Sequence, residues 1–358
     1  MFTLAIVTGL VFVQTPQVEP NADAAKVAPK QLRRQLPIGL EEIYGYSALL
    51  TSERRDPRMN LDTYLPETQR LMYQFKLNVK EKKADDIVVL DYLRTGFKVA
   101  VEGGAEGEQY IPMDGGNLNF KITLSPTNAV LDLVDISPKK PEKKVKDENV
   151  MWLRRLQDGG VVSGQALTQQ VVGQFFQELQ RMSLMIGSLD SSMDFAPKLP
   201  DEEVVPGDTW EETVSYQPQR ARGTKSTTVQ RLDMTYTYVG LVKVNGKPFE
   251  QIKGSVTMDA NLKDYIDGAY GIPKAQSPFK SVNVKFQMNS VFNLDPKSLR
   301  TVYAEVRSNG NLSTDFDFQG MRTTSEDRFT GEAKIANRSA KIIAPVKTKA
   351  KPAKKPKN

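Results

Sequence analysis

The stretch Leu71-Met72-Tyr73-Gln74-Phe75-Lys76-Leu77-Asn78-Val79-Lys80 decides the fold class, because a large apolar side chain stands at every second position. Successive side chains of a β-strand point to opposite faces of a sheet. This spacing therefore predicts a strand with one buried face. Similar alternation recurs over residues 118–124, 234–238, 252–262, 282–294 and 312–318. The chain is thus expected to be mainly β, with antiparallel neighbours.

Turn signals separate these runs. Ser125-Pro126-Thr127-Asn128 and Asn245-Gly246 are typical of tight turns between antiparallel strands. Asn309-Gly310 carries the same dipeptide signal and predicts a further hairpin turn. Residues 263–280 hold two Gly and two Pro and are expected to form a long loop.

One segment follows the helical period instead, and we expect a helix over 164–186. Ser163 can cap its start and Gly187 its end. Its apolar stripe contains Leu167, Val171, Phe175, Leu179, Met182 and Ile186. The expected fold is α+β: a curved antiparallel sheet or half-barrel that cradles this one long helix.

We expect a binding site for a hydrophobic molecule in the space between helix and sheet. We predict that it is lined by large, adaptable side chains: Phe175, Phe176, Leu179, Met182 and Trp210. The alternative is that the stripe is ordinary core, since an amphipathic helix normally buries one face for packing.

The N-terminus predicts export. Phe2 to Val13 is an almost unbroken apolar run, shorter than the roughly 20 residues that span a bilayer. Ala22-Asp23-Ala24 then provides the small-x-small pattern of a signal-peptide cleavage site. We expect a signal peptide over 1–24, a polar lead-in over 25–60, one β-rich domain over 61–337 and a disordered basic tail over 338–358. A periplasmic or extracellular location follows.

Charge is concentrated in the tail. The net charge of the chain is +6, and the eight Lys and Arg from Arg338 onward, with no Asp or Glu, leave −2 for residues 1–337. A specific nucleic-acid surface would place its positive charge on the fold. The tail can instead contact an anionic surface through Lys347, Lys349, Lys351, Lys354, Lys355 and Lys357.

Residue types limit the chemistry. The chain has no His and no Cys, which removes the usual general base and any thiolate nucleophile or ligand. The acidic residues around Asp208 match no calcium-loop spacing, and Asp315 and Asp317 are expected on the solvent face of a strand. We expect no catalysis, no bound metal and no cofactor.

The segment from Leu199-Pro200 through Val204 to Gly207-Asp208-Thr209-Trp210 forms the pattern LP-x-x-x-V-x-x-G-D-x-W. It resembles a family of uncharacterised exported bacterial proteins, which implies no established activity. The order strands, helix, strands is also similar to periplasmic lipoprotein carriers, in which a curved sheet wraps around a helix. That architecture implies an acyl-chain site.

Two functions therefore remain open: an envelope protein that binds a lipid or similar hydrophobe, and a structural or interaction protein anchored by its tail. The second makes a direct prediction. Deletion of Lys341–Asn358 should abolish co-sedimentation with anionic phospholipid vesicles, because it removes seven Lys. The melting temperature should not change. Unaltered vesicle binding would contradict a role for the tail.

Overall fold

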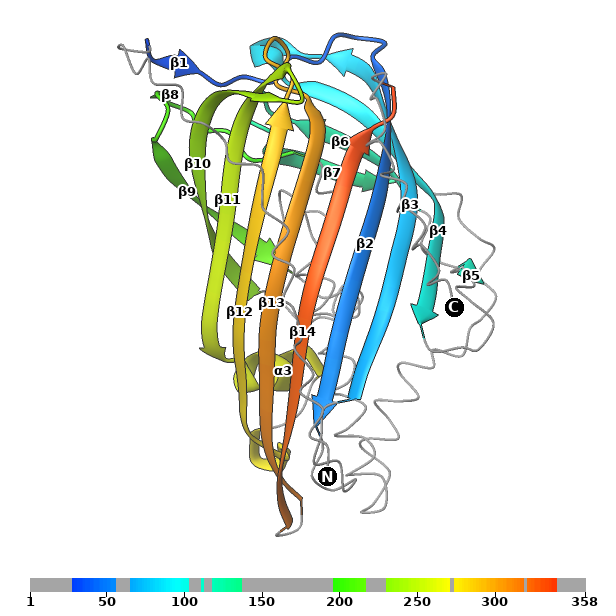
Figure 1. Ribbon diagram of the computed structural model, residues 1–358, viewed down its shortest axis with the longest axis vertical. Coiled ribbons are helices and arrows are strands. Elements are labelled where there is room, and N and C mark those ends of the chain that lie inside the picture. The colour runs from blue at the N-terminus through cyan, green and yellow to red at the C-terminus, as the bar shows by residue number, and fades with distance from the viewer. Residues whose placement is uncertain are drawn as a thin grey trace, which may run out of the picture.

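A single antiparallel sheet dominates the computed structural model, which describes residues 28–55, 65–102, 111–112, 118–136, 196–216, 230–270, 274–318 and 321–339 (Figure 1). Within these ranges the sheet holds twelve strands. Eleven follow one path in the order β7-β6-β4-β3-β2-β14-β13-β12-β11-β10-β9, and β5 pairs with β4. The fold is mainly β, as the alternation predicts.

The first half of the sheet comprises β2 (Glu41–Arg55), β3 (Leu65–Lys82), β4 (Val88–Glu102), β5 (Ile111–Pro112), β6 (Leu118–Leu124) and β7 (Val130–Asp135). The second half comprises β9 (Thr209–Tyr216), β10 (Gln230–Val244), β11 (Lys247–Asn261), β12 (Phe279–Leu294), β13 (Thr301–Phe318) and β14 (Met321–Asn337). A two-stranded ribbon joins β1 (Lys30–Gln31) and β8 (Glu203–Val204). The helical elements are η2 (Ala84–Asp86), α3 (Lys263–Tyr270) and η3 (Lys274–Gln276).

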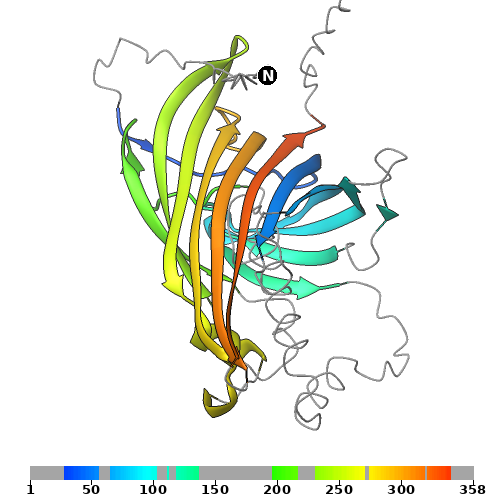
Figure 2. The same ribbon diagram turned by 60° about the horizontal axis from the view of Figure 1, so that its bottom comes forward.

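The two halves meet where β2 pairs with β14. Their register runs from Tyr44 opposite Asn337 to Arg55 opposite Glu326. Each half is a meander that leads away from this seam, so β7 and β9 form the two ends of the path. Figure 2 shows the result as a curved trough, with β9 and β7 on opposite wings.

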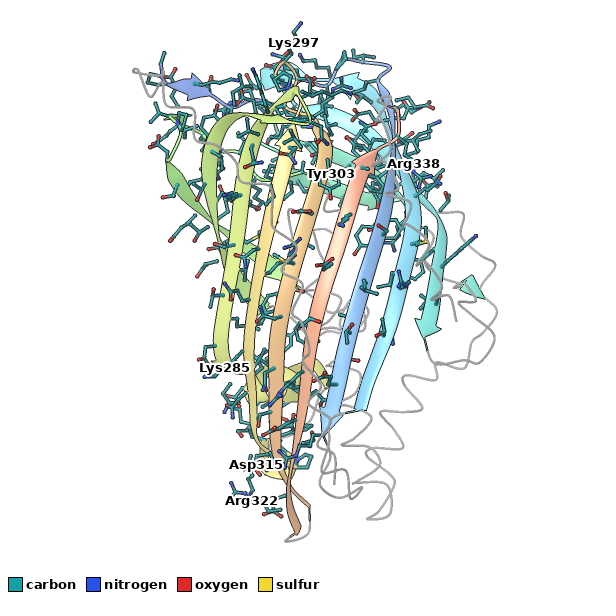
Figure 3. The ribbon with its side chains drawn as sticks, in the orientation of Figure 1. Lys285, Lys297, Tyr303, Asp315, Arg322 and Arg338 are labelled. Atoms are coloured by element: carbon teal, nitrogen blue, oxygen red, sulfur yellow. The ribbon has the colours of Figure 1, made fainter. Side chains whose placement is uncertain are left out.

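Alternation divides every long strand between two faces. Along β12 buried and exposed residues alternate from Val282 to Ser290, and β11 alternates in the same way from Ile252 onward. The inward side chains join one apolar cluster that draws on β2, β3, β4, β6 and β10 through β14. The outer face is polar and exposed, as Figure 3 illustrates with Lys285, Asp315 and Arg322.

The sequence expectations differ from the structure at three places. Residues 41–55, expected within a polar lead-in, form the central strand β2, because Tyr44, Tyr46, Ala48 and Leu50 alternate inward. Residues 263–270, expected as loop, form α3. Asn261 Oδ1 accepts the Lys263 N–H at 3.1 Å, and Ile266 is buried. The predicted helix 164–186 lies outside the described residues.

The third difference concerns the Asn-Gly signals. Asn245-Gly246 does form the β10–β11 turn, with φ of 50° and 75° at the two residues. The turn at Ser125–Asn128 is also present. It is closed by the Asn128 N–H, which donates to the Ser125 carbonyl at 3.1 Å. Asn309-Gly310 is not a turn: it lies inside β13, which pairs on both sides there.

The side chain opposite Gly310 on the neighbouring strand explains why a glycine is needed at this position. Phe329 stands opposite it, and a Cβ added to Gly310 would lie 2.3 Å from the Phe329 ring. Gly254 and Tyr236 repeat the arrangement between β11 and β10, with 3.1 Å to the Tyr236 ring. Because the glycine has no side chain, the aromatic ring on the neighbouring strand can lie over its backbone. Such ring-over-glycine pairs help to fix strand register in curved sheets.

We therefore expect Gly310→Ala to destabilise the protein by about 1–3 kcal/mol, because the buried Phe329 ring must shift within packed core. Gly45→Ala is the matched control. The three atoms nearest to its added Cβ all belong to the Arg338 guanidinium, the end of a flexible and exposed side chain. Its effect should stay within about 0.5 kcal/mol. Urea unfolding measures the stability of both variants. An equal loss of stability in the two would contradict the proposed role of the Phe329 ring over Gly310.

Candidate functional site

The inner face of the first half of the sheet is built from aromatic rings. Tyr44 stacks on Phe75 with centroids 4.8 Å apart, and Phe75 stacks on Tyr92 at 5.3 Å. Closer to the middle of the strands, Tyr46 stacks on Tyr73 at 4.2 Å. These rings come from β2, β3 and β4, and they form a ladder across the three strands. We call them the aromatic ladder.

A β-bulge at Gly96 changes which side chains of β4 face inward. Gln74 pairs with Thr95 and Met72 pairs with Lys98, so Gly96 and Phe97 together stand opposite Tyr73. Gly96 has φ of 66°, which suits the residue that such a bulge needs. Arg94 and Phe97 are three apart and would ordinarily lie on opposite faces, but the extra residue turns both toward Tyr73.

Arg94 consequently lies against aromatic rings on the inner face. It stands opposite buried Phe75, and its guanidinium carbon is 5.0 Å from the Tyr73 centroid and 5.6 Å from that of Phe97. All three residues of this Arg94–Tyr73–Phe97 cluster are half-buried. A guanidinium over an aromatic ring is attracted to the negative face of that ring.

The cluster lies at a step in the sheet. The last β4–β6 pair is Arg94 with Leu118, and beyond it the described residues add only the two-residue β5, opposite Lys98 and Val99. Figure 1 shows β4 forming the margin of the trough below β6 and β7. The apolar inner face thus reaches a margin next to Arg94.

β7 is the outermost strand on this wing among the described residues, and apolar side chains on it and at Ile136, just after it, are exposed. Leu131 is 54% exposed and Val134 45%, while Leu133 and Ile136 are each 38% exposed. Leu133 pairs with buried Ile122 and so continues the inner face. Phe120 and Val130 pack only partly against the core. Apolar surface therefore runs from the core out to this edge.

Residues 196–208, here called the clasp, connect the two wings at one end of the trough. The Leu199 N–H donates to the Thr127 carbonyl at 2.9 Å, and Asn128 Nδ2 donates to the Pro197 carbonyl at 2.7 Å. On the other wing, Trp210 Nε1 donates to the Lys198 carbonyl at 3.2 Å. The Trp210 ring stacks on Tyr236, with centroids 5.6 Å apart.

The LP-x-x-x-V-x-x-G-D-x-W pattern is accounted for by the clasp. Leu199 and Val204 are buried, and Gly207 takes φ of 102° in a turn. Asp208 closes that turn by accepting the Val205 N–H at 2.8 Å through its carboxylate. Its own carbonyl accepts the Tyr238 N–H, which aligns β9 with β10. The pattern's polar residues thus have structural partners.

A buried polar cluster holds the same end of the trough. The Glu42 carboxylate accepts Arg300 Nη1 at 2.9 Å, Asn337 Nδ2 at 2.8 Å and the Tyr44 hydroxyl at 2.9 Å. Burial, together with the nearby Glu42 charge, raises the pKa of Tyr44 above its ordinary value. Tyr44 therefore remains a protonated donor. These partners satisfy the carboxylate and make it structural.

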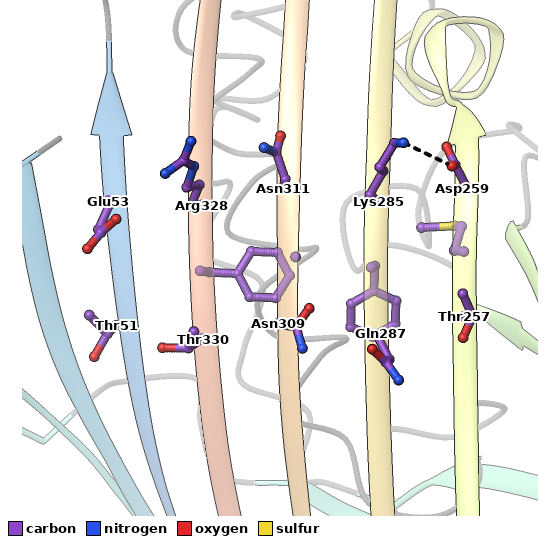
Figure 4. Close-up of a pocket in the computed structure, with 14 residues that line it drawn as sticks. Thr51, Glu53, Thr257, Asp259, Lys285, Gln287, Asn309, Asn311, Arg328 and Thr330 are labelled. Atoms are coloured by element: carbon purple, nitrogen blue, oxygen red, sulfur yellow. Dashed lines mark ion pairs between the residues drawn. The ribbon is translucent and has the colours of Figure 1, made fainter. Parts of the chain in front are cut away.

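An open groove of about 550 Å³ lies on the opposite, outer face (Figure 4). Two in-register rows of polar side chains cross five strands there. One is uncharged: Thr51, Thr330, Asn309, Gln287 and Thr257. The other is mostly charged: Glu53, Arg328, Asn311, Lys285 and Asp259. Every charged member is at least partly exposed, which is typical of a hydrated sheet face.

The carboxylates singled out in the sequence form ion pairs. Asp315 binds the Arg322 guanidinium across β13 and β14, which lowers the pKa of Asp315 below its ordinary value. Asp317 lies 3.8 Å from Lys280 Nζ. Among the described residues no three acidic side chains gather closely enough to hold a metal ion, and no helix is long and apolar enough to cross a bilayer.

Of the five predicted ligand-binding residues, the described ranges include Trp210 alone. It faces inward opposite Tyr236 and donates a hydrogen bond to the Lys198 carbonyl of the clasp. Phe175, Phe176, Leu179 and Met182 lie outside those ranges, as do the tail lysines. Sequence reasoning missed the Arg94–Tyr73–Phe97 cluster. The isolated Gly96 between strand-like runs was the available sequence signal for a bulge.

No family model and no curated protein matches the chain, so the family resemblance of the clasp segment stays untested. Among solved structures, lipovitellin, described by its lipid–protein interactions, is 10% identical with a TM-score of 0.37. That match covers 85% of this chain and 25% of lipovitellin. A mutant porin of Rhodopseudomonas blastica is 8% identical, with a TM-score of 0.21, over 83% of this chain and 100% of the porin.

OccK5 of Pseudomonas aeruginosa is 6% identical with a TM-score of 0.22, over 83% of this chain and 98% of that one. TM-scores this low establish neither a shared fold nor a shared function. The chain also spans only a quarter of the length of lipovitellin. The functional argument therefore rests on the residues of this chain.

Trp210→Phe separates a clasp role from a ligand role. Phe keeps a ring over Tyr236 but removes the indole N–H that donates to the backbone carbonyl of buried Lys198. We therefore expect the free energy of unfolding, measured in urea, to fall by about 1–2 kcal/mol. Affinity for a fluorescent fatty-acid probe should not change. Weaker probe binding at unchanged stability would restore Trp210 as a ligand contact.

Proposed function

We propose that this protein binds a hydrophobic molecule, such as a lipid acyl chain, against the inner face of the sheet at the margin formed by β4, β6 and β7, and that it is not an enzyme. One observation carries the proposal: in the part of the chain that the structure describes, the apolar inner face continues to the outermost strand of this wing and stays partly exposed there. Leu71, Tyr73, Phe120 and Val130 are only half-buried.

A surface of this kind matches the requirements of a lipid site. A contiguous exposed apolar patch on a protein commonly marks a binding surface, whereas scattered apolar residues carry no such meaning. Here Leu133 extends the inner face, and Leu131 lies beside it on the same edge strand. Each methylene transferred from water to such a surface contributes about 0.8 kcal/mol. An acyl chain can therefore bind without any polar contact.

The proposal extends to location. The N-terminal apolar run and the Ala22-Asp23-Ala24 pattern support export, so the ligand would be bound in the cell envelope or outside the cell. The basic tail supports contact with an anionic surface nearby. The helix stripe of Phe175, Phe176, Leu179 and Met182 remains a sequence-based candidate for the same site.

Two adjacent residues of β3 provide a matched test. Leu71 lies on the inner face, opposite Val99, while Met72 is 38% exposed on the outer face. We expect Leu71→Gln to weaken binding of a fluorescent fatty-acid probe about five-fold or more, because an amide replaces apolar contact. Met72→Gln should leave the probe affinity unchanged.

Thermal unfolding of both variants checks that the fold is retained. Native mass spectrometry of the purified full chain should in addition detect a bound lipid that Leu71→Gln retains less well. If the wild-type chain binds no probe, or if both variants bind it as the wild type does, the proposed function is wrong.

A further inference from the structure

The proposed function makes no use of the groove on the outer face of the sheet. This groove lies between two rows of side chains that cross β2, β14, β13, β12 and β11 in register (Figure 4). Between the rows, Met258, Phe286 and Phe329 are buried on the inner face, so their backbone forms the floor. The volume of about 550 Å³ is within the range of small-molecule sites. The groove therefore has room for a ligand.

The first row consists of groups that both donate and accept hydrogen bonds. Its members are two amides and three hydroxyls: Gln287, Asn309, Thr51, Thr257 and Thr330. A hydroxyl or a primary amide offers a donor and an acceptor together. The hydroxyl groups of a sugar have the same double character, so each can pair with such a side chain in either direction. This row therefore suits a polyhydroxylated ligand.

The second row carries two negative and two positive charges, so its net charge is zero. Glu53 and Asp259 are the two ends of the row, while Arg328 and Lys285 flank Asn311 at its centre. Lys285 also pairs with Asp259 at 3.3 Å. An acidic polymer along this row would meet a carboxylate at each end, and such contacts between like charges cost free energy. An uncharged ligand avoids that cost.

The direction of the groove indicates an elongated ligand. Neighbouring strands lie ~4.8 Å apart, so the five strands extend over about 19 Å. Each strand presents one side chain from each row, and polar groups therefore recur at this interval on both sides of the floor. A linear oligosaccharide likewise carries hydroxyl groups along both edges of its chain. Because the Phe286 and Phe329 rings face inward, hydrogen bonds would hold the sugar units.

We propose that this groove binds a segment of an uncharged linear oligosaccharide, which lies across the five strands and is hydrogen-bonded by both rows. The site is on the face opposite the proposed lipid surface. The inference therefore goes beyond the proposed function, and each ligand can bind without displacing the other.

The test is a calorimetric titration of the full-length wild-type protein with hexasaccharides. Maltohexaose, cellohexaose and N-acetylchitohexaose are the uncharged probes, and hexagalacturonate is the acidic one. At least one uncharged probe should bind, and it should bind more tightly than hexagalacturonate. Added salt should not weaken it, because the ligand carries no charge to screen. The double variant Gln287→Ala, Asn309→Ala should bind the same probe about ten-fold more weakly, because two amide contacts are lost.

Asn289→Ala is the matched control. Asn289 lies on β12, two residues from Gln287 on the same exposed outer face, but it does not line the groove. Its replacement should change the affinity by less than about two-fold. The melting temperatures of all variants should equal that of the wild type, since each altered side chain is exposed.

Three results would overturn the inference. The wild-type chain binds none of the uncharged hexasaccharides, or it binds hexagalacturonate more tightly than all of them. In the third, the double variant binds no more weakly than Asn289→Ala. Leu71→Gln, which alters the proposed lipid surface, should bind the hexasaccharide as the wild type does. Failure of the groove proposal therefore leaves the lipid proposal standing, and the reverse also holds.

Discussion

The pairing of β2 with β14 is the contact on which the rest of the sheet depends. It joins two meanders that are otherwise independent, and it links residues almost three hundred positions apart in the chain. Without it the described sheet would have four free edges in place of two. Because Tyr44, Tyr46, Ala48 and Leu50 alternate inward along this seam, the inner face is continuous from one wing to the other. The apolar surface that carries the proposed function is a product of that continuity.

The inner and outer faces of the sheet differ in how they hold charged groups. The outer face carries polar rows whose charges are exposed or paired, as for Lys285 with Asp259 at 3.3 Å, and pairs of this kind contribute little to stability. On the inner face the Glu42 carboxylate accepts three donors, and the Arg94 guanidinium carbon lies over the Tyr73 and Phe97 rings. A buried carboxylate with three donors is stabilised as part of the structure.

Period-two alternation was sufficient to predict the sheet and its buried face, because it reports directly which side chains point inward. It could not predict that β2 is central, since pairing partners distant in the sequence leave no local mark. Asn309-Gly310 misled for a related reason: the ring that explains Gly310 is that of Phe329, on the next strand. Arg94 was missed because its face depends on the bulge at Gly96, and alternation alone assigns faces as if every strand were regular. The helix 164–186 and its candidate ligand contacts remain predictions.

The clasp has a consequence for selectivity. An enclosed pocket measures the length of an acyl chain, because its far wall stops the last methyl group. In the described residues the two wings are linked through the clasp at the capped end, by Leu199 to Thr127 and Lys198 to Trp210. A ligand bound on the inner face, as proposed, would meet the clasp at that end, so the clasp would set how far the ligand reaches along the trough.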